Sequence, residues 1–379
     1  MLAGNSIGRE FVVTCFGESH GRCVGAIVDG CPAGLPLSEA DIQNELGRRI
    51  PAKQEIFARR EKDRVEILSG IFNEFTTGAP ICMLVWNREA VPEDYDLVKD
   101  TPRPGHADYP ARVKYSGFND YRGGGRFSGR ITAALVMAGV VSKKLLGLVD
   151  IEVLAYAAEI GRVRIDRTPA LEEIRENVYR TSVRCPDYDR AKEMETAILE
   201  AKRQGDSVGG IVECIVSNVK VGVGEPVFDS LDADIAKILF DIPAVKGVEF
   251  GVGFKASRLK GSENNDPYAI RDKRVVTMTN NAGGILGGLS SGMPILIRVA
   301  IKPTPSISKE QETVDLTEME KTVIHIRGRH DPCIVPKAVP AVESAVAVVL
   351  ADHMLRAGFI PRNLGGLKLG KNLNDEKKD

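Results

Sequence analysis

Short apolar runs rich in β-branched residues recur along the chain, and many of them lie close to glycine. Such runs are typical of β-strands that end in tight turns. The predicted strands are Phe11–Cys15, Cys23–Val28, Val65–Ile71, Ile81–Val85, Ile151–Ala157, Gly210–Val216, Val248–Phe254, Val275–Thr279 and Met293–Ile301.

Longer segments between these runs carry apolar residues at the spacing of one helix face. Ser38 precedes the first of them as an N-cap, and Thr168-Pro169 fits the N-cap and first position of the third. The predicted helices are Glu39–Arg48, Ile131–Leu146, Ala170–Arg180, Arg190–Gln204, Leu231–Phe240 and Val339–Ala357. The chain therefore mixes helices and strands throughout.

A weak internal repeat runs through this pattern. The segments Ala26–Gly30 and Leu37–Ile42 are echoed by Cys214–Asn218 and Leu231–Ile235, and a Gly-Arg pair precedes an Ala/Val-rich helix in each part. These features predict two similar halves, divided between residues 160 and 205, that pack as one unit. Chance similarity of short amphipathic segments explains them almost as well.

Composition narrows the class of protein. The chain has 43% hydrophobic and 27% charged residues and a net charge of −1, so nothing global attracts nucleic acid or a membrane surface. The seven cysteines form no Cys-x-x-Cys pair, which argues against a zinc ribbon or disulfide framework. No apolar run looks long enough to span a bilayer, and no secretory leader pattern is present. We expect a cytoplasmic protein with one domain over residues 1–370, a disordered tail at 371–379, and no metal, nucleic-acid or membrane partner.

Two segments rich in arginine and glycine are candidates for a ligand site, Gly123–Arg130 and Arg327–Cys333. Paired guanidinium groups bind anionic oxygens, and glycine lets the backbone come close to a ligand. In the second segment His330 stands beside Asp331, which offers a proton carrier and a neighbour to orient it. The pattern predicts a ligand with several negative charges.

Two other histidines lie in glycine-containing turns, His20 in Phe16–Gly21 and His106 in Arg103–Tyr109. The functional interpretation makes His20 a general acid and places Arg103 and His106 across one ligand. The alternatives are a hydrogen-bonded histidine in a tight turn and an ordinary surface turn. The role of Arg48-Arg49 is equally open, because basic residues at a helix C-terminus also complement the helix dipole.

Two loops offer features of a cofactor site. Asn281–Gly292 exposes many backbone N–H groups, which can line a phosphate or a flat ring. Lys302–Ser306 adds one cation and two hydroxyls in a turn stiffened by proline, which suits the phosphate end of a nucleotide-like cofactor. Neither loop matches a dinucleotide or ATP motif. The residues alone indicate arginine electrostatics, a few His and Asp side chains, and an organic cofactor.

Taken together, these motifs resemble the chorismate synthase family over nearly the whole chain. Several of the matching motifs are long and rarely seen elsewhere, so the resemblance is specific. The motifs are Gly4–Gly8, Phe16–Gly21, Arg103–Asp108, Asp120–Arg126, Gly205–Gly210, Gly224–Asp229, Asn281–Gly288, Lys302–Thr304 and Arg327–Cys333.

The resemblance implies the last shared step toward the aromatic amino acids in the shikimate pathway. The substrate would be 5-enolpyruvylshikimate 3-phosphate, converted to chorismate and phosphate by anti 1,4-elimination. The family requires reduced FMN (FMNH2) although the net reaction changes no redox state. The resemblance also implies an α+β fold, a β-α-β sandwich with helices between two antiparallel sheets, assembled as a homotetramer.

The resemblance implies three catalytic residues in this sequence. His20 would protonate the departing phosphate, His106 the reduced flavin near N1, and Asp331 would help to remove the hydrogen near flavin N5. The expected substrate ligands are Ser19, Arg48, Arg49, Arg103, Ser128, Arg130 and Arg329. The residues expected around the flavin are Arg49, Arg126, Phe127, Ser128, Gly287, Lys302, Pro303, Thr304, Pro305, Ser306 and Arg329, and the Arg49 region is where the family contacts NADPH.

Four positions depart from the family pattern. Lys337 stands where arginine is common, which keeps the charge but loses the planar fork. Ile131 and Phe127 replace a glutamate and a small polar residue, and Glu55 replaces an expected arginine, which bears on NADPH contact more than on catalysis. The chain length leaves no room for a reductase insertion, so we expect a monofunctional enzyme supplied with reduced FMN from outside, for example by an external flavin reductase.

The residues leave two other classes of function open. One is a different FMN- or NADPH-linked oxidoreductase that acts on an anionic substrate at the same site. The other is a nucleotide- or RNA-binding module built on the arginine pairs, although the near-neutral charge and the 6% aromatic content weigh against base-stacking platforms.

Overall fold

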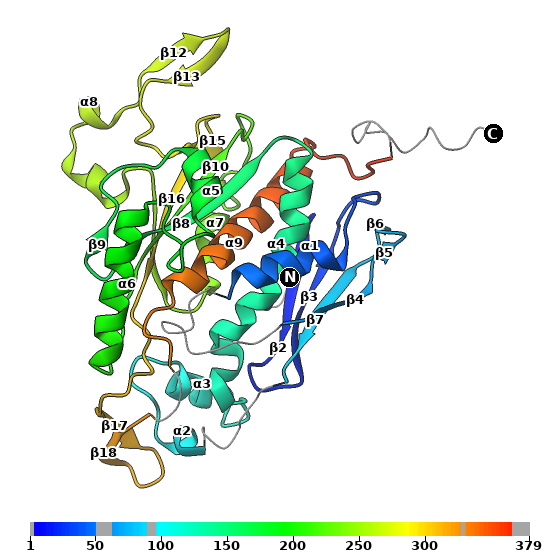
Figure 1. Ribbon diagram of the computed structural model, residues 1–379. Helices are drawn as coiled ribbons and strands as arrows, with labels where there is room; N and C mark the ends of the chain where they lie inside the picture. Colours follow the sequence, from blue (N-terminus) through cyan, green and yellow to red (C-terminus); the bar gives the residue numbers. More distant parts are fainter. Residues whose placement is uncertain (1–3, 51–62, 89–95, 327–329, 366–379) are drawn as a thin grey trace.

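Two five-stranded antiparallel sheets enclose a layer of helices in the computed structural model, which describes residues 4–50, 63–88, 96–326 and 330–365 (Figure 1). Each sheet turns one apolar face toward the helices, and the polar residues of the alternating pattern face outward. This arrangement confirms the expected α+β sandwich. The predicted tail at 371–379 lies outside the described residues.

The first sheet has the strand order β1-β2-β3-β7-β4. Its strands are β1 (Ser6–Ile7), β2 (Val12–Gly17), β3 (Cys23–Asp29), β4 (Val65–Ser69) and β7 (Ile81–Trp86). In β3 the side chains of Val24, Ala26 and Val28 are fully buried, as the two-residue period of a strand requires for one core-facing side.

The second sheet has the strand order β11-β16-β10-β8-β9. Its strands are β8 (Glu152–Ile160), β9 (Val163–Arg164), β10 (Gly210–Ser217), β11 (Val245–Phe250) and β16 (Ile295–Ile301). Ile295, Ile297 and Val299 alternate into the core along β16. Predicted strand Val248–Phe254 ends at Phe250, because Gly251 and Gly253 adopt left-handed φ angles that break the extended run.

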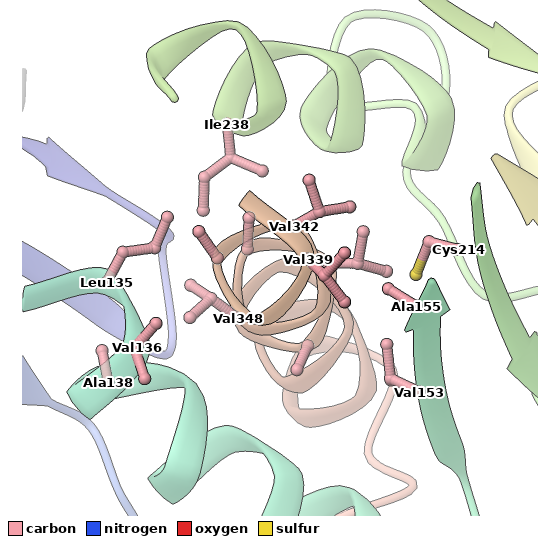
Figure 2. Close-up of a cluster of buried hydrophobic side chains, with 14 of the residues drawn as sticks. Leu135, Val136, Ala138, Val153, Ala155, Cys214, Ile238, Val339, Val342 and Val348 are labelled. Carbon is pink, nitrogen blue, oxygen red and sulfur yellow. The ribbon is translucent and has the colours of Figure 1, made fainter. Parts of the chain in front are cut away.

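The helices between the sheets are α1 (Glu39–Arg48), α4 (Thr132–Gly147), α7 (Leu231–Asp241) and α9 (Val335–Arg356). Figure 2 shows Val339, Val342 and Val348 of α9 surrounded by side chains from α4, α7, β8 and β10. Helix α9 is long and apolar enough to cross a membrane, so the expectation that no apolar run has this length was wrong. Its apolar window is entirely buried, as in the core helix of a globular protein.

Helix α9 also fastens the beginning of the chain. The carboxylate Oδ1 of Asp352 accepts hydrogen bonds from the backbone N–H groups of Arg9, Glu10 and Phe11 at 2.8, 2.7 and 2.8 Å. The last helix of the core therefore holds the chain just ahead of β2.

The two halves of the chain share one strand order. In the first half β2, β3, α1, β4, β7 and α4 follow one another, with β2-β3-β7-β4 in the sheet. In the second half β8, β10, α7, β11, β16 and α9 do the same, with β8-β10-β16-β11 in the sheet. This correspondence supports the predicted duplication, and the repeated order starts again at β8. Both the duplication and its division between residues 160 and 205 stay predictions.

The remaining elements lie at the ends and edges of the sandwich. Thr168-Pro169 is not the start of a helix, since Ala170 is the N-cap of α5. Helix α9 begins at Val335 rather than Val339 because Pro336 fits the first turn.

Several short elements were not predicted, among them the hairpin β17–β18. The bounds are β5 (Ile71–Phe72), β6 (Phe75–Thr76), α2 (Asp96–Asp100), α3 (Asp108–Lys114), α5 (Leu171–Asn177), α6 (Tyr188–Arg203), α8 (Gly261–Asn264), β12 (Tyr268–Arg271), β13 (Arg274–Thr277), β14 (Ile285–Leu286), β15 (Leu289–Ser290), β17 (Gln311–Asp315) and β18 (Glu320–Ile324).

Candidate active site

Three successive glycines before α4 bring two distant histidines together. Gly123, Gly124 and Gly125 have φ angles of 58°, 81° and 51°, which place all three in the left-handed region. A Cβ on Gly123 would lie 2.1 Å from Cε1 of His20, and a Cβ on Gly124 would lie 2.8 Å from Cε1 of His106. The two imidazoles therefore pack against adjacent residues of one loop, which we call the triglycine loop (residues 123–125).

His20 lies in the turn that follows β2. Ser19 and His20 are both buried, and the N–H of Ser19 donates to the carbonyl of Gly125 at 3.2 Å. The hydroxyl of Ser128 lies 3.1 Å from that of Ser19 and also accepts the N–H of Arg130 at 3.3 Å. The predicted residues Ser19, His20 and Ser128 thus lie in one cluster.

His106 shares a buried carboxylate with Arg103. Asp108 accepts two hydrogen bonds from the Arg103 guanidinium, each of 2.7 Å, and its Oδ1 lies 2.9 Å from Nδ1 of His106. Burial alone would raise the pKa of Asp108, but the hydrogen bonds from Arg103 and His106 outweigh it and hold that pKa well below its usual range. Asp108 is therefore an anion at neutral pH.

The carboxylate at Nδ1 also fixes the tautomer of His106. Nη2 of Arg103 lies 3.2 Å from the same Nδ1, but it already donates to Asp108 at a shorter distance. We therefore assign the Nδ1 proton to the bond with Asp108. This leaves Nε2, which faces Gly124, as the atom that can carry a proton to or from a ligand.

Arg49 and Arg130 also meet on one carboxylate. Nη1 of Arg49 lies 3.1 Å from Oδ2 of Asp63, and Nη1 of Arg130 lies 2.5 Å from Oδ1. Nε of Arg130 donates to Oδ1 of Asn87 at 3.0 Å. Asn87 follows β7 and donates its amide to the carbonyls of Glu18 and Gly21 at 2.9 and 2.8 Å, so it spans the His20 turn.

The 302–306 loop packs beside the Arg103–His106 turn. Nζ of Lys302 donates to the carbonyl of Gly105, and Nη1 of Arg103 donates to the hydroxyl of Ser306 at 3.3 Å. Burial lowers the pKa of Lys302, and the neighbouring charge of Lys246 lowers it further. The buried hydroxyl of Thr304 has no hydrogen-bond partner among the described residues.

Asp331 is connected to this loop through residues 207 and 208. The hydroxyl of Ser207 donates to the carbonyl of Thr304 at 2.7 Å, and the N–H of Val208 donates to the carbonyl of Pro332 at 2.8 Å. Asp331 forms an ion pair of 2.5 Å with Lys337. Lys337, which stands where the resemblance predicts arginine, therefore pairs with the predicted catalytic acid.

Arg48 does not join its neighbour Arg49. Its guanidinium stacks over the ring of Tyr179 at 4.4 Å and pairs with Glu45. It lines a separate cavity of about 600 Å³, together with Tyr179 and Glu343. The structure thus places Arg48 on the far side of the α1 terminus from the residues that hold Arg49.

Other predicted residues have more varied positions. Arg126 donates to the carbonyls of Gly17 and Cys15 at 3.0 and 3.1 Å, so it braces the end of β2. Phe127 follows it and is exposed, whereas Pro305 packs near Gly105, and Pro303 lies between Lys302 and Thr304. Arg329 and Glu55 lie outside the described residues.

Gly287 lies away from the cluster. It forms the turn of the β14–β15 hairpin, and β16, which then leads to Lys302, alone spans roughly 20 Å at about 3.3 Å per residue. Figure 1 shows β15 at the opposite end of the molecule from α3, which begins at Asp108. Contact of Gly287 with the same ligand as the triglycine loop stays a prediction.

Three residues of this site, Asp63, Asn87 and Asp108, were not predicted from the sequence. Asp108 had a signal, because it closes the Arg103–Asp108 motif and a carboxylate two positions after a histidine can orient it. No local sequence pattern indicated Asp63 or Asn87, because each contacts an arginine from a different part of the chain.

Comparisons with known proteins agree on one family. The family model described as chorismate synthase matches residues 11–355. The chorismate synthase of Dehalococcoides mccartyi is 55% identical over 94% of this chain and 98% of its own length. That of Methanosarcina barkeri is 54% identical over 96% of this chain and its full length. A crystal structure of chorismate synthase superposes with a TM-score of 0.73 at 32% identity and covers 93% of each chain.

Proposed function

This chain belongs to the chorismate synthase family, and we infer that it is the lyase that removes phosphate from 5-enolpyruvylshikimate 3-phosphate to give chorismate. The observation that carries this inference is the triglycine loop, against which His20 and His106 pack at adjacent residues. Four buried or half-buried cations lie around it, namely Arg49, Arg103, Arg130 and Lys302. The substrate has two carboxylates and a phosphate, so it needs such a concentration of positive charge.

The chain's own groups divide the work of the elimination. Arg49, Arg103 and Arg130 bind and orient the anionic groups, because each guanidinium is held by a buried carboxylate. His20 donates a proton to the leaving phosphate. His106 holds or moves a proton at Nε2, with Nδ1 held by Asp108.

The 302–306 loop fits the phosphate end of a flavin nucleotide. It offers the ammonium of Lys302, the hydroxyl of Ser306 and the buried hydroxyl of Thr304, which has no hydrogen-bond partner in the described part of the chain. A bound anion would supply the hydrogen-bond partner and offset the unfavourable burial of Lys302. When bound there, reduced FMN would supply electron density that helps the phosphate to leave, with no net redox change.

The remaining properties of the enzyme are part of the same proposal. It works in the cytoplasm as a homotetramer, takes reduced FMN from an external flavin reductase, and does not consume NADPH in each turnover. Sedimentation of the purified protein checks the tetramer, and NADPH absorbance during turnover checks the reductant.

The decisive assay is anaerobic turnover with dithionite-reduced FMN and 5-enolpyruvylshikimate 3-phosphate, with chorismate absorbance and phosphate release followed together. The two products should form in equal amounts while the flavin remains reduced. Stoichiometric flavin oxidation, or phosphate without chorismate, would move the function to a flavin-linked oxidoreductase.

Asp108→Asn tests the orientation of His106. The change should lower kcat by about 10- to 100-fold, the scale expected when a reacting group is misplaced by about 1 Å. Steady-state kinetics measure this effect, and an unchanged kcat would leave Asp108 without a role in the orientation of His106.

Asp331→Ala tests the predicted acid of the 331 segment. Turnover should fall by about 100-fold or more, since a proton-handling group is lost, while FMN still binds. Flavin fluorescence titration and single-turnover rates separate the two quantities. The exposed Asp189→Ala is the matched control and should change neither. Weakened FMN binding with a normal rate at saturating FMN would make Asp331 a binding residue.

A further inference from the structure

Asp63 stands between two arginines that the proposed function assigns to the substrate. Its side chain is buried, and its two oxygens take one guanidinium each, Arg49 on Oδ2 and Arg130 on Oδ1. Asp63 is itself fixed, because its carbonyl accepts the side-chain amide of Gln43 at 2.6 Å. The amide oxygen of Gln43 in turn accepts the N–H of Val65 at 3.1 Å, which anchors this segment to β4.

This geometry sets the charge as well as the spacing of the arginine pair. Two guanidiniums side by side repel each other and carry a charge of +2, whereas the shared carboxylate reduces the group to a net +1. It also takes one N–H of each guanidinium, while Nη2 of Arg49 donates to the hydroxyl of Thr132 at 3.2 Å and Nε of Arg130 donates to Asn87. The two guanidinium groups are therefore held in place before any anion binds.

Asn87 connects the same pair to the His20 turn. Its Oδ1 accepts Nε of Arg130, and its Nδ2 donates to the carbonyls of Glu18 and Gly21 on either side of Ser19 and His20. The backbone N–H of Asn87 also donates to the carbonyl of Arg22 at 3.0 Å. Through these bonds, a shift of Arg130 is transmitted to the turn that carries the acid.

We propose that Asp63 is a positioning residue for phosphate departure, which through Arg130 and Asn87 fixes the arginine pair at a set distance from His20. The anion that leaves and the group that protonates it are thereby placed by one network. This proposal rests on the proposed function, because it assigns the phosphate to the side of the site that holds Arg130 and His20.

Asp63→Asn separates this role from a structural one, because two measured constants should move in opposite directions. Removal of the carboxylate charge raises the net charge of the arginine pair and frees guanidinium donors, so competitive inhibition by inorganic phosphate should tighten by about 3- to 10-fold. The kcat for chorismate formation should fall by about 10- to 100-fold, since the pair is no longer set against His20.

Asp63→Glu and Asp234→Asn complete the experiment. Asp63→Glu keeps the charge but displaces the carboxylate, so the phosphate inhibition constant should stay within about twofold of the parent while kcat falls by about 10-fold or more. Asp234, which pairs with His353 away from the site, provides the same Asp→Asn change as a control and should lower only the melting temperature.

The outcomes distinguish this proposal from the function on which it rests. If the parent protein makes chorismate but Asp63→Asn weakens phosphate inhibition or leaves kcat unchanged, the positioning role is wrong and the enzyme assignment stands. If Asp63→Asn does not fold, a normal kcat in Asp63→Glu overturns the proposal by itself. If the parent protein makes no chorismate, the proposed function itself is wrong.

Discussion

Replacement of His106 by alanine should lower kcat by about 100- to 10,000-fold, the usual contribution of a positioned proton carrier. The loss should appear without unfolding, because the His106 side chain is partly exposed and sits in a turn rather than in the core. Asp108 would keep its two bonds to the Arg103 guanidinium, so the carboxylate is not left unpaired. Substrate affinity should therefore change much less than turnover.

The measurement is the anaerobic assay with substrate and reduced FMN at saturation, together with a thermal unfolding curve. His325→Ala makes the same chemical change at an exposed residue that follows the end of β18, and it should leave both kcat and the melting temperature unaltered. A rate in His106→Ala within about twofold of the parent would remove His106 from the proton pathway.

The second large effect should come from a single methyl group in the triglycine loop. Gly123→Ala would place its Cβ 2.1 Å from two ring atoms of His20, and Gly124→Ala would place it 2.8 Å from His106. In addition, alanine at these positive φ angles costs about 1–2 kcal/mol. Each substitution should move one imidazole by a distance close to 1 Å and lower kcat by about 100-fold.

Gly129→Ala is the control for both, since a Cβ at Gly129 would meet nothing within 4 Å and its backbone is not left-handed. Crystal structures of the two variants would show which histidine has moved, and the assay would show the rate. Full activity in both variants would contradict the inference that the two histidines pack closely against the triglycine loop. The distinction matters because Gly123→Ala should displace His20 and its neighbour Ser19 but not His106, whereas Gly124→Ala should displace His106 but not His20.

Local patterns predicted most of the secondary structure because the deciding interactions are local. Helix α1 begins and ends as predicted, since Ser38 accepts the N–H of Asp41 as its N-cap and the apolar residues Ile42 and Leu46 face the core. The hairpin β12–β13 was found only in part, because Tyr268 and Ile270 are exposed and give no inward-facing pattern.

The candidate site was predictable only where its signal is contained in one short motif. His20, His106 and Arg103 stand in distinctive turns, and the structure brings them together at the triglycine loop. Arg48 and Arg49 are neighbours in sequence, but successive residues near a helix end point about 100° apart, so only Arg49 reaches Asp63. Which carboxylate holds which arginine depends on contacts between distant segments, and a single sequence carries no local trace of them.

The burial of α9 on all sides has a consequence for the synthesis of the protein. Helices α4 and α7 and strands β8 and β10 of the second sheet pack against this helix, and its Asp352 fastens the chain just before β2. A nascent chain therefore cannot cover the inner face of the second sheet until residues 335–356 have been synthesised. Until then this face is an exposed apolar surface, of the kind that makes partly folded chains prone to aggregate.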